Sequence, residues 1–156
     1  MIVLGIDPGT ISTGYAVLKA TDRAYTPLDF GCITPPPLAP LNERYCIIFD
    51  SISHIIDKFN PKALAIETQF FGKNAQSAIK LAMARGVAIV ASSKKGLSVH
   101  EYTPLKAKCA VANGKASKEQ VQASICLLLG LKDINAKSDA YDALALAICH
   151  LHTLRL

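Results

Sequence analysis

The sequence predicts an α/β fold in which helices flank a five-stranded mixed sheet. Three observations lead to this fold class: three strand-like segments follow one another near the N-terminus, helical and strand-like segments alternate after them, and 51% of the residues are hydrophobic. A chain of 156 residues has the usual length of one domain and buries about two-thirds of the surface that it exposes when unfolded. We therefore expect a single domain that spans residues 1–156.

The first three strands are predicted from apolar runs that turn residues separate. Ile2–Asp7 and Thr13–Lys19 are joined through a Pro-Gly turn, and Gly14 permits another backbone to approach the second strand closely. Tyr25–Ile33 has the composition of a third strand. The proline triplet 35–37 then requires an extended linker, which ends this part of the sheet.

A helix, a strand and another helix follow the linker. Apolar residues recur at helical spacing from Leu41 to Phe59, and Asn60-Pro61 predicts the end of that helix. The apolar run Lys62–Glu67 is typical of a strand that is covered on both faces. The alanine-rich segment Asn74–Ser92 predicts a second helix, which can pack closely on the sheet or on a second copy of the chain.

The last third of the chain predicts one strand and three helices. Val99–Tyr102 has the pattern of a short fifth strand, and a helix begins after Thr103-Pro104, where proline suits the first turn. Asn113-Gly114 marks a loop. Ser117–Leu129 and Lys137–Leu154 then complete the chain as two further helices.

Positive charge is concentrated in the middle of the sequence. The formal net charge is +5, and residues 68–137 carry eleven basic side chains against three acidic ones. Residues 1–67 carry five basic and seven acidic side chains. A basic section between acidic segments suits a polyanion that is held over a metal centre, although an ordinary solvated lysine surface gives the same pattern.

The cysteines and the apolar runs exclude several classes of protein. The five cysteines include no C-x-x-C pair, so we expect them to be reduced and mostly buried, without a zinc site or a cysteine nucleophile. Arg85 and Asp142 interrupt the longest apolar stretches, and the N-terminal apolar run is too short for a signal peptide. We therefore expect a cytoplasmic protein that does not span a membrane.

Four carboxylates occupy apolar settings, where an unpaired charge is costly to desolvate. Asp7 and Glu67 end strand-like runs, and strand ends of α/β sheets are where functional sites are built. Asp139 and Asp142 are three residues apart on one face of an otherwise uncharged helix. The two helical acids could instead only complement the helix dipole, but that role does not explain the acids on the strands.

Four carboxylates held close together cannot all remain ionised in metal-free protein, because like charges raise one another's pKa. Hard divalent cations such as Mg²⁺ relieve this repulsion and keep positions open for water and phosphate oxygens. Two such ions about 4 Å apart can activate water and stabilise the leaving oxygen of a phosphodiester. The pattern therefore indicates a metal-dependent phosphodiesterase.

Several blocks of the sequence form an ordered set of motifs that covers nearly the whole chain: Gly5–Thr10 with Thr13-Gly14-Tyr15, Ala65-Ile66-Glu67 with Phe70, Lys73–Leu81, Ala84–Ala88, and Asp139–Ala145. This set resembles the RuvC-type crossover junction endodeoxyribonucleases. The resemblance implies a ribonuclease-H-like fold, a homodimer, and symmetric nicking of four-way (Holliday) junctions in DNA recombination and repair. It also implies branch-migration machinery as a partner.

The resemblance assigns roles to individual residues. It implies that Asp7, Glu67, Asp139 and Asp142 are the catalytic carboxylates and hold Mg²⁺, with two ions in each active site and Mn²⁺ as a substitute. Four residues fall near the positions that contact DNA in the family, the aromatic one against junction bases and the lysines near phosphates: Phe70, Lys73, Lys108 and Lys118. Physically, an exposed aromatic beside cations can stack on unpaired bases.

Three other functions fit parts of the sequence. A ribonuclease-H-like RNA-processing nuclease would share the first strand but would not need the Phe70 block. An actin-like ATPase also has an Asp-x-Gly-Thr phosphate loop, but it needs two such domains and this chain has the length of one. A non-catalytic DNA-binding module would not need all four acids.

Overall fold

The computed structural model describes residues 1–21, 24–68, 74–132 and 136–154. Within these residues, strands and helices follow one another as the sequence predicts. The strands are β1 (Ile2–Asp7), β2 (Thr13–Ala20), β3 (Tyr25–Ile33), β4 (Ala63–Glu67) and β5 (Ser98–Tyr102). The helices are α1 (Leu41–Phe59), α2 (Ala75–Lys94), α3 (Pro104–Val111), α4 (Lys118–Leu129) and α5 (Ser138–Thr153).

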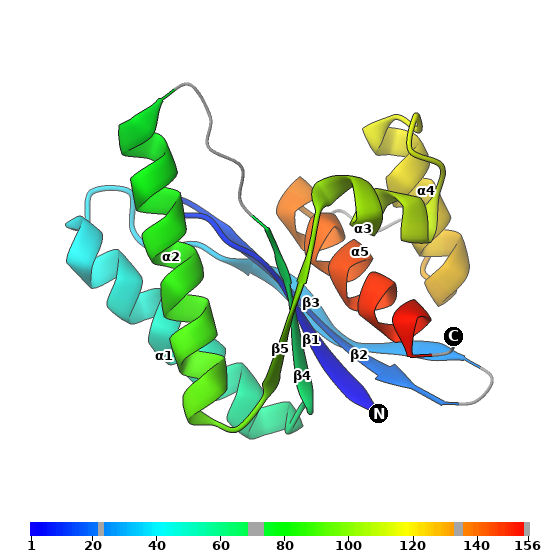
Figure 1. The fold of residues 1–156 in the computed structure, drawn as a ribbon, viewed down its shortest axis with the longest axis horizontal. Helices are drawn as coiled ribbons and strands as arrows, with labels where there is room; N and C mark the ends of the chain where they lie inside the picture. The colour runs from blue at the N-terminus through cyan, green and yellow to red at the C-terminus, as the bar shows by residue number, and fades with distance from the viewer. Residues whose placement is uncertain (22–23, 69–73, 133–135, 155–156) are drawn as a thin grey trace.

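The five strands form one mixed sheet in the order β3-β2-β1-β4-β5. The first three strands pair antiparallel, whereas β1, β4 and β5 run parallel. Helices α1 and α2 lie on one side of the sheet, and α3, α4 and α5 lie on the other (Figure 1). The predicted fold class, a five-stranded mixed sheet flanked by helices, is confirmed.

Each face of the sheet has its own hydrophobic core, because side chains of a strand alternate between the faces. On β1, Leu4 and Ile6 belong to the core under α1 and α2. Val3 belongs to the core under α5. On β4, Leu64 and Ile66 face α1 and α2 in the same way, whereas Ala65 faces α5.

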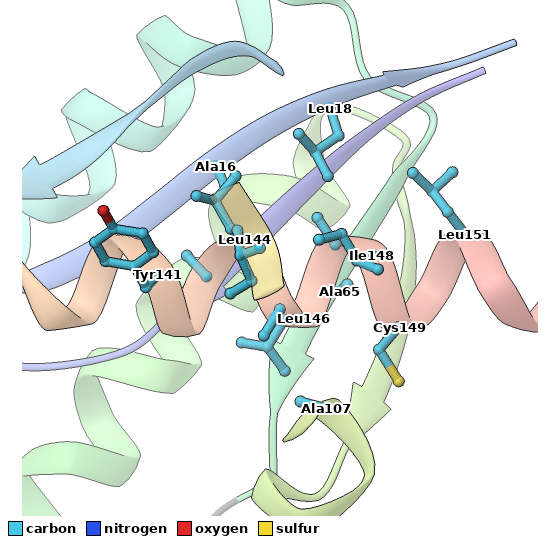
Figure 2. Close-up of a cluster of buried hydrophobic side chains, with 14 of the residues drawn as sticks. Ala16, Leu18, Ala65, Ala107, Tyr141, Leu144, Leu146, Ile148, Cys149 and Leu151 are labelled. Carbon is cyan, nitrogen blue, oxygen red and sulfur yellow. The ribbon is translucent and has the colours of Figure 1, made fainter. Parts of the chain in front are cut away.

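Helix α5 is the central element of the second core. Nearly all of its residues from Ala140 to Leu151 are buried, and the helix packs across β1, β2 and β4. Figure 2 shows Leu144 beside Ala16 of β2, whereas Cys149 points toward α3. Such all-round burial explains why the sequence of this helix carries almost no charge outside its first turns.

Two helices end in residues with left-handed backbone conformation. Asn60 ends α1 with φ 49°, and Gly130 ends α4 with φ 63°. At the start of α4, Ser117 and Gln120 form a reciprocal capping box, in which each side chain accepts a hydrogen bond from the other residue's backbone N–H. This cap fixes where α4 begins, and with it the position of Lys118.

The expectation that the cysteines are mostly buried is wrong. All five are free thiols, but only Cys149 is buried, whereas Cys46 and Cys109 are exposed. Cys46 lies on α1 and Cys109 on α3, and composition does not reveal which face of a helix is covered. Within the described part of the chain, none of the helices combines the length and the apolar character that a membrane crossing requires.

Candidate metal centre

Strand alternation places the first two acids on the α5 side of the sheet. Asp7 follows Val3 and Gly5 on that face of β1, and Glu67 follows Ala65 on that face of β4. The strands are parallel neighbours, in the register Ile6 to Ile66, so both carboxylates emerge at the same edge of the sheet. Both side chains are partly buried.

Two glycines allow α5 to bring the other two acids to this edge. A Cβ atom on Gly14 would overlap the backbone carbonyl oxygen of Asp139, and one on Gly5 would overlap that of Ala143. Gly14 is also the residue of β2 that pairs with Asp7. The first turns of α5 therefore lie directly on the strands at the point where Asp7 ends β1.

The structure brings three of the four predicted acids into one group. Asp7, Asp139 and Asp142 each offer a carboxylate oxygen, and these oxygens all lie within 4.8 Å of one another. Glu67 is outside this group but close enough to interact electrostatically with Asp7 and Asp142. It also lines the same cleft as Asp142.

The electrostatics of the group are those of crowded, desolvated carboxylates. Burial, followed by the charges of Glu67, Asp142 and Asp139, raises the pKa of Asp7 from 3.8 to about 8. Burial also raises the pKa of Glu67, and the Asp142 charge adds to this effect. For Asp142, burial raises the pKa while the Lys118 ammonium opposes the rise.

These residues fit a hard divalent cation. Their donor atoms are carboxylate oxygens, the ligands that Mg²⁺ and Mn²⁺ prefer. None of the ion pairs found among the described residues includes any of the four carboxylates. A cation in the group would relieve the repulsion that raises the Asp7 pKa.

A cleft of about 190 Å³ opens beside the acids, between α3, α4 and α5. Glu67 and Asp142 line one side of it, and the predicted Lys108 and Lys118 also lie on its walls. Lys118 follows the Ser117 cap and is near enough to lower the pKa of Asp7. Two lysines therefore stand beside a cluster of carboxylates without forming ion pairs with them.

Comparison with known proteins identifies the family. The family model described as "Crossover junction endodeoxyribonuclease RuvC" matches residues 3–150. The chain belongs to the RuvC family. It is 49% identical over 151 residues to the RuvC of Protochlamydia amoebophila, covering 96% of this chain and 90% of that protein. It is 47% identical over 154 residues to the RuvC of Citrifermentans bemidjiense, covering 98% and 93% respectively.

A solved RuvC structure has the same fold. The structure of Thermus thermophilus RuvC in complex with a Holliday junction substrate superposes with a TM-score of 0.90 and 31% identity, covering 99% of this chain and 96% of that one. The RuvC relationship confirms the predicted ribonuclease-H-like fold and the predicted nuclease class. It does not support the alternative of an RNA-processing nuclease.

One residue that positions the candidate site of the present chain was not predicted from the sequence. Arg85 of α2 donates from Nε to the backbone carbonyl of Glu67 at 3.0 Å. Its Nη2 lies 2.6 Å from a carboxylate oxygen of Glu101 on β5. The Arg85 side chain, which is 20% exposed, therefore holds the end of β4 without neutralising the Glu67 carboxylate. Its place in the Ala84–Ala88 motif was the only sequence signal for it.

Two of the predicted DNA contacts lie outside the described residues. Phe70 and Lys73 belong to the segment 69–73, between β4 and α2. Their roles therefore stay predictions from the RuvC resemblance. Of the predicted DNA-contacting residues, Lys108 and Lys118 are the two that the structure places, and both lie on the cleft beside the acids.

The raised Asp7 pKa predicts that metal binding is coupled to proton release. The folded metal-free protein holds the Asp7 proton more tightly than the unfolded chain does. The contribution of Asp7 to the free energy of unfolding is therefore largest below about pH 4, and it is lost as the pH rises through about 8. We expect Mg²⁺ binding at a pH about one unit below 8 to release close to one proton from Asp7, measured by titration calorimetry in buffers of different ionisation enthalpy. Asp7→Asn should abolish this proton release; unchanged release in that variant would assign the proton to another group.

Proposed function

We propose that this RuvC-family chain resolves Holliday junctions in DNA recombination and repair by symmetric hydrolysis of two phosphodiesters. The observation that carries this proposal is the group of carboxylate oxygens from Asp7, Asp139 and Asp142 within 4.8 Å of one another. Family membership supplies the substrate class, because relatives are named crossover junction endodeoxyribonucleases and one was solved with a Holliday junction.

In this proposal Asp7, Glu67, Asp139 and Asp142 are the catalytic carboxylates and the ligands of two Mg²⁺ ions, for which Mn²⁺ can substitute. When bound, such ions activate water and neutralise the charge that develops on the cleaved phosphate. Asp7 would hold an ion only as the carboxylate, so its proton would pass to solvent on binding. Arg85 keeps Glu67 in position through its main-chain carbonyl, which leaves the side-chain carboxylate free to bind.

Lys108 and Lys118 are proposed to bind the DNA backbone. Both line the cleft that adjoins the acids, and they lie on separate helices, α3 and α4. An ammonium group near a phosphate contributes through charge, and it releases counterions from the DNA. Their positions would hold a DNA strand over the carboxylates, where electrostatic repulsion alone would exclude it.

The function is tested with synthetic four-way DNA and linear duplex DNA of the same arm sequences. We expect paired, symmetric nicks in the four-way DNA with Mg²⁺ and intact DNA without it. The linear duplex should remain uncut in both conditions. Equal cutting of the two substrates, or cutting that persists in a chelator, would contradict the proposal.

We further propose that the active form is a homodimer joined through α2. Large apolar side chains that the described chain leaves exposed gather on this helix, and Ile79, Met83 and Val90 share one stripe with Gly86. A Cβ on Gly86 would meet nothing within 4 Å, so a second helix could approach the backbone there. Exposed apolar patches mark interfaces, and a two-fold dimer places two identical sites on a two-fold junction.

Met83→Glu is expected to convert the dimer into monomers and to uncouple the two nicks, because it places a charge in the centre of this stripe. Light scattering after size-exclusion chromatography measures the mass, and a cruciform plasmid reports paired against single nicks. The matched control is Leu127→Glu on α4, where an equally apolar side chain is 86% exposed. A Met83→Glu protein that stays dimeric would place the interface elsewhere.

Three further expectations stay proposals. The chain acts as a single nuclease domain over residues 1–156, it works in the cytoplasm, and it acts together with branch-migration machinery. The first follows from its length, and the last from the family resemblance. Phe70 is proposed to contact junction bases, and Lys73 is proposed to contact the DNA backbone.

A further inference from the structure

A second cleft lies on the opposite side of the sheet edge from the lysine-lined one. It has a volume of about 480 Å³, and three separate segments form it: the turn after β1, the start of α1 and the start of α2. We call it the α1–α2 cleft; its walls include Thr10, Ile11, Leu41, Arg44, Lys80 and Leu81. Its volume is in the range of small-ligand sites.

The lining of this cleft combines apolar, hydroxyl and cationic groups. Ile11 and Leu81 supply exposed aliphatic surface, and Thr10 and Ser77 supply hydroxyls. Lys80 supplies an ammonium group. None of the ion pairs found among the described residues includes this group. No carboxylate is among the residues of the described chain that line it. This chemistry suits a nucleotide, which presents an apolar base and an anionic phosphate together.

Ile11 projects into solvent from the hydrogen-bonded turn that follows Asp7. It lies four residues after Asp7 in a turn where Thr13 Oγ1 donates to the Gly9 carbonyl at 2.7 Å and accepts from the Gly9 N–H at 3.2 Å. Thr13 itself is buried, yet Ile11 is 71% exposed. An exposed aliphatic side chain in this turn resembles the apolar wedges that proteins place against DNA bases.

The other walls are braced as well. Arg44 donates from Nε to the Ala39 carbonyl at 2.9 Å and from Nη2 to the Pro37 carbonyl, which fixes the linker before α1. Tyr45 donates to the Lys80 carbonyl at 3.1 Å and so ties α1 to α2. The α1–α2 cleft is therefore largely formed before any ligand arrives, which lowers the entropic cost of binding.

We propose that the α1–α2 cleft binds the nucleotide next to the cleaved phosphodiester, with its base against Ile11 and its phosphate beside Lys80. The inference rests on the proposed function. Cationic clefts would then flank the carboxylates on both sides, with Lys108 and Lys118 in one and Lys80 in the other. We expect a DNA strand that contacts both clefts to pass over the carboxylates.

The test uses four-way junctions that carry 2-aminopurine, in turn, at each nucleotide flanking the cut position, in buffer without divalent cations. Wild-type protein should change the fluorescence at one of these nucleotides. Ile11→Ser should reduce that change at least about threefold, because the apolar contact with the base is lost. The control Leu127→Ser, which shortens an exposed leucine on α4, should keep the wild-type change.

Lys80→Gln should weaken junction binding about 5- to 10-fold near 0.1 M salt and reduce the slope of log affinity against log salt by about 0.9. Lys19→Gln is the matched control, because Lys19 is exposed and pairs with Ile2 at the far end of β1. The proposal is overturned if Ile11→Ser keeps the full fluorescence change or Lys80→Gln keeps the wild-type slope. A wild-type protein that leaves four-way DNA intact with Mg²⁺ refutes the proposed function instead.

Discussion

Asp7→Asn is expected to reduce junction cleavage at least about 1000-fold, since a cation that stabilises the transition state is worth several kcal/mol and each 1.4 kcal/mol is about tenfold in rate. Asp7 is the acid that the others surround: Glu67, Asp142 and Asp139 all raise its pKa. Asparagine has nearly the same shape but cannot supply the anionic oxygen. Single-turnover cleavage of a labelled four-way junction with Mg²⁺ measures the loss.

Junction binding by Asp7→Asn should be unchanged at a pH where Asp7 is protonated and tighter above about pH 8, where the substitution removes a negative charge from the surface proposed to meet phosphates. The matched control is Asp57→Asn, since Asp57 is exposed on α1 and, among the described residues, forms a surface ion pair with Lys95. That variant should cleave like wild type. Undiminished cleavage by Asp7→Asn would remove the carboxylate group from the mechanism.

Gly14→Ala is expected to damage both the stability and the activity of the protein. Its new Cβ would overlap the backbone carbonyl of Asp139, which a side-chain rotation cannot relieve, so α5 must move. Overpacking of this kind lowers the free energy of unfolding by about 3 kcal/mol. In a chain of this size, that loss lowers the melting temperature by roughly 10 °C. Because Asp139 and Asp142 move with the helix, cleavage at a temperature where the variant is folded should fall about 100-fold.

Gly31→Ala is the control for this substitution. Gly31 also lies in the antiparallel part of the sheet, but the three atoms nearest its added Cβ would all belong to the Tyr15 side chain at 3.4 Å or more, an ordinary contact. We expect its melting temperature and cleavage rate to stay near the wild-type values. If Gly14→Ala behaved like Gly31→Ala, α5 would not be seated on β2 as the structure has it.

Local pattern was enough to predict the fold. Alternating apolar residues, turn residues and caps predicted every strand and helix, with ends that differ from the structure by two residues at most. The reason is that each signal acts locally: Asn60 ends α1 and Ser117 starts α4 through bonds to their own neighbours. The strand-end positions of Asp7 and Glu67 likewise follow from period-two alternation.

Other features depend on how distant segments pack and could not be predicted. The sequence does not reveal that Glu67 stands slightly apart from the three aspartates, because that depends on the separation of β4 from α5. The contact from Arg85 to the end of β4 joins residues from two elements. The exposure of Cys46 and the existence of the α1–α2 cleft depend on which helix faces remain uncovered.

The most direct test is a crystal of the protein soaked in Mn²⁺, with the anomalous signal locating each ion. The fold is proposed to gather the carboxylates of Asp7, Glu67, Asp139 and Asp142 around hard cations. The strongest anomalous peaks should therefore lie about 2.1 Å from carboxylate oxygens of Asp7 and its neighbours in this group. Peaks at unrelated surface acids, with none near Asp7 at saturating Mn²⁺, would contradict the account.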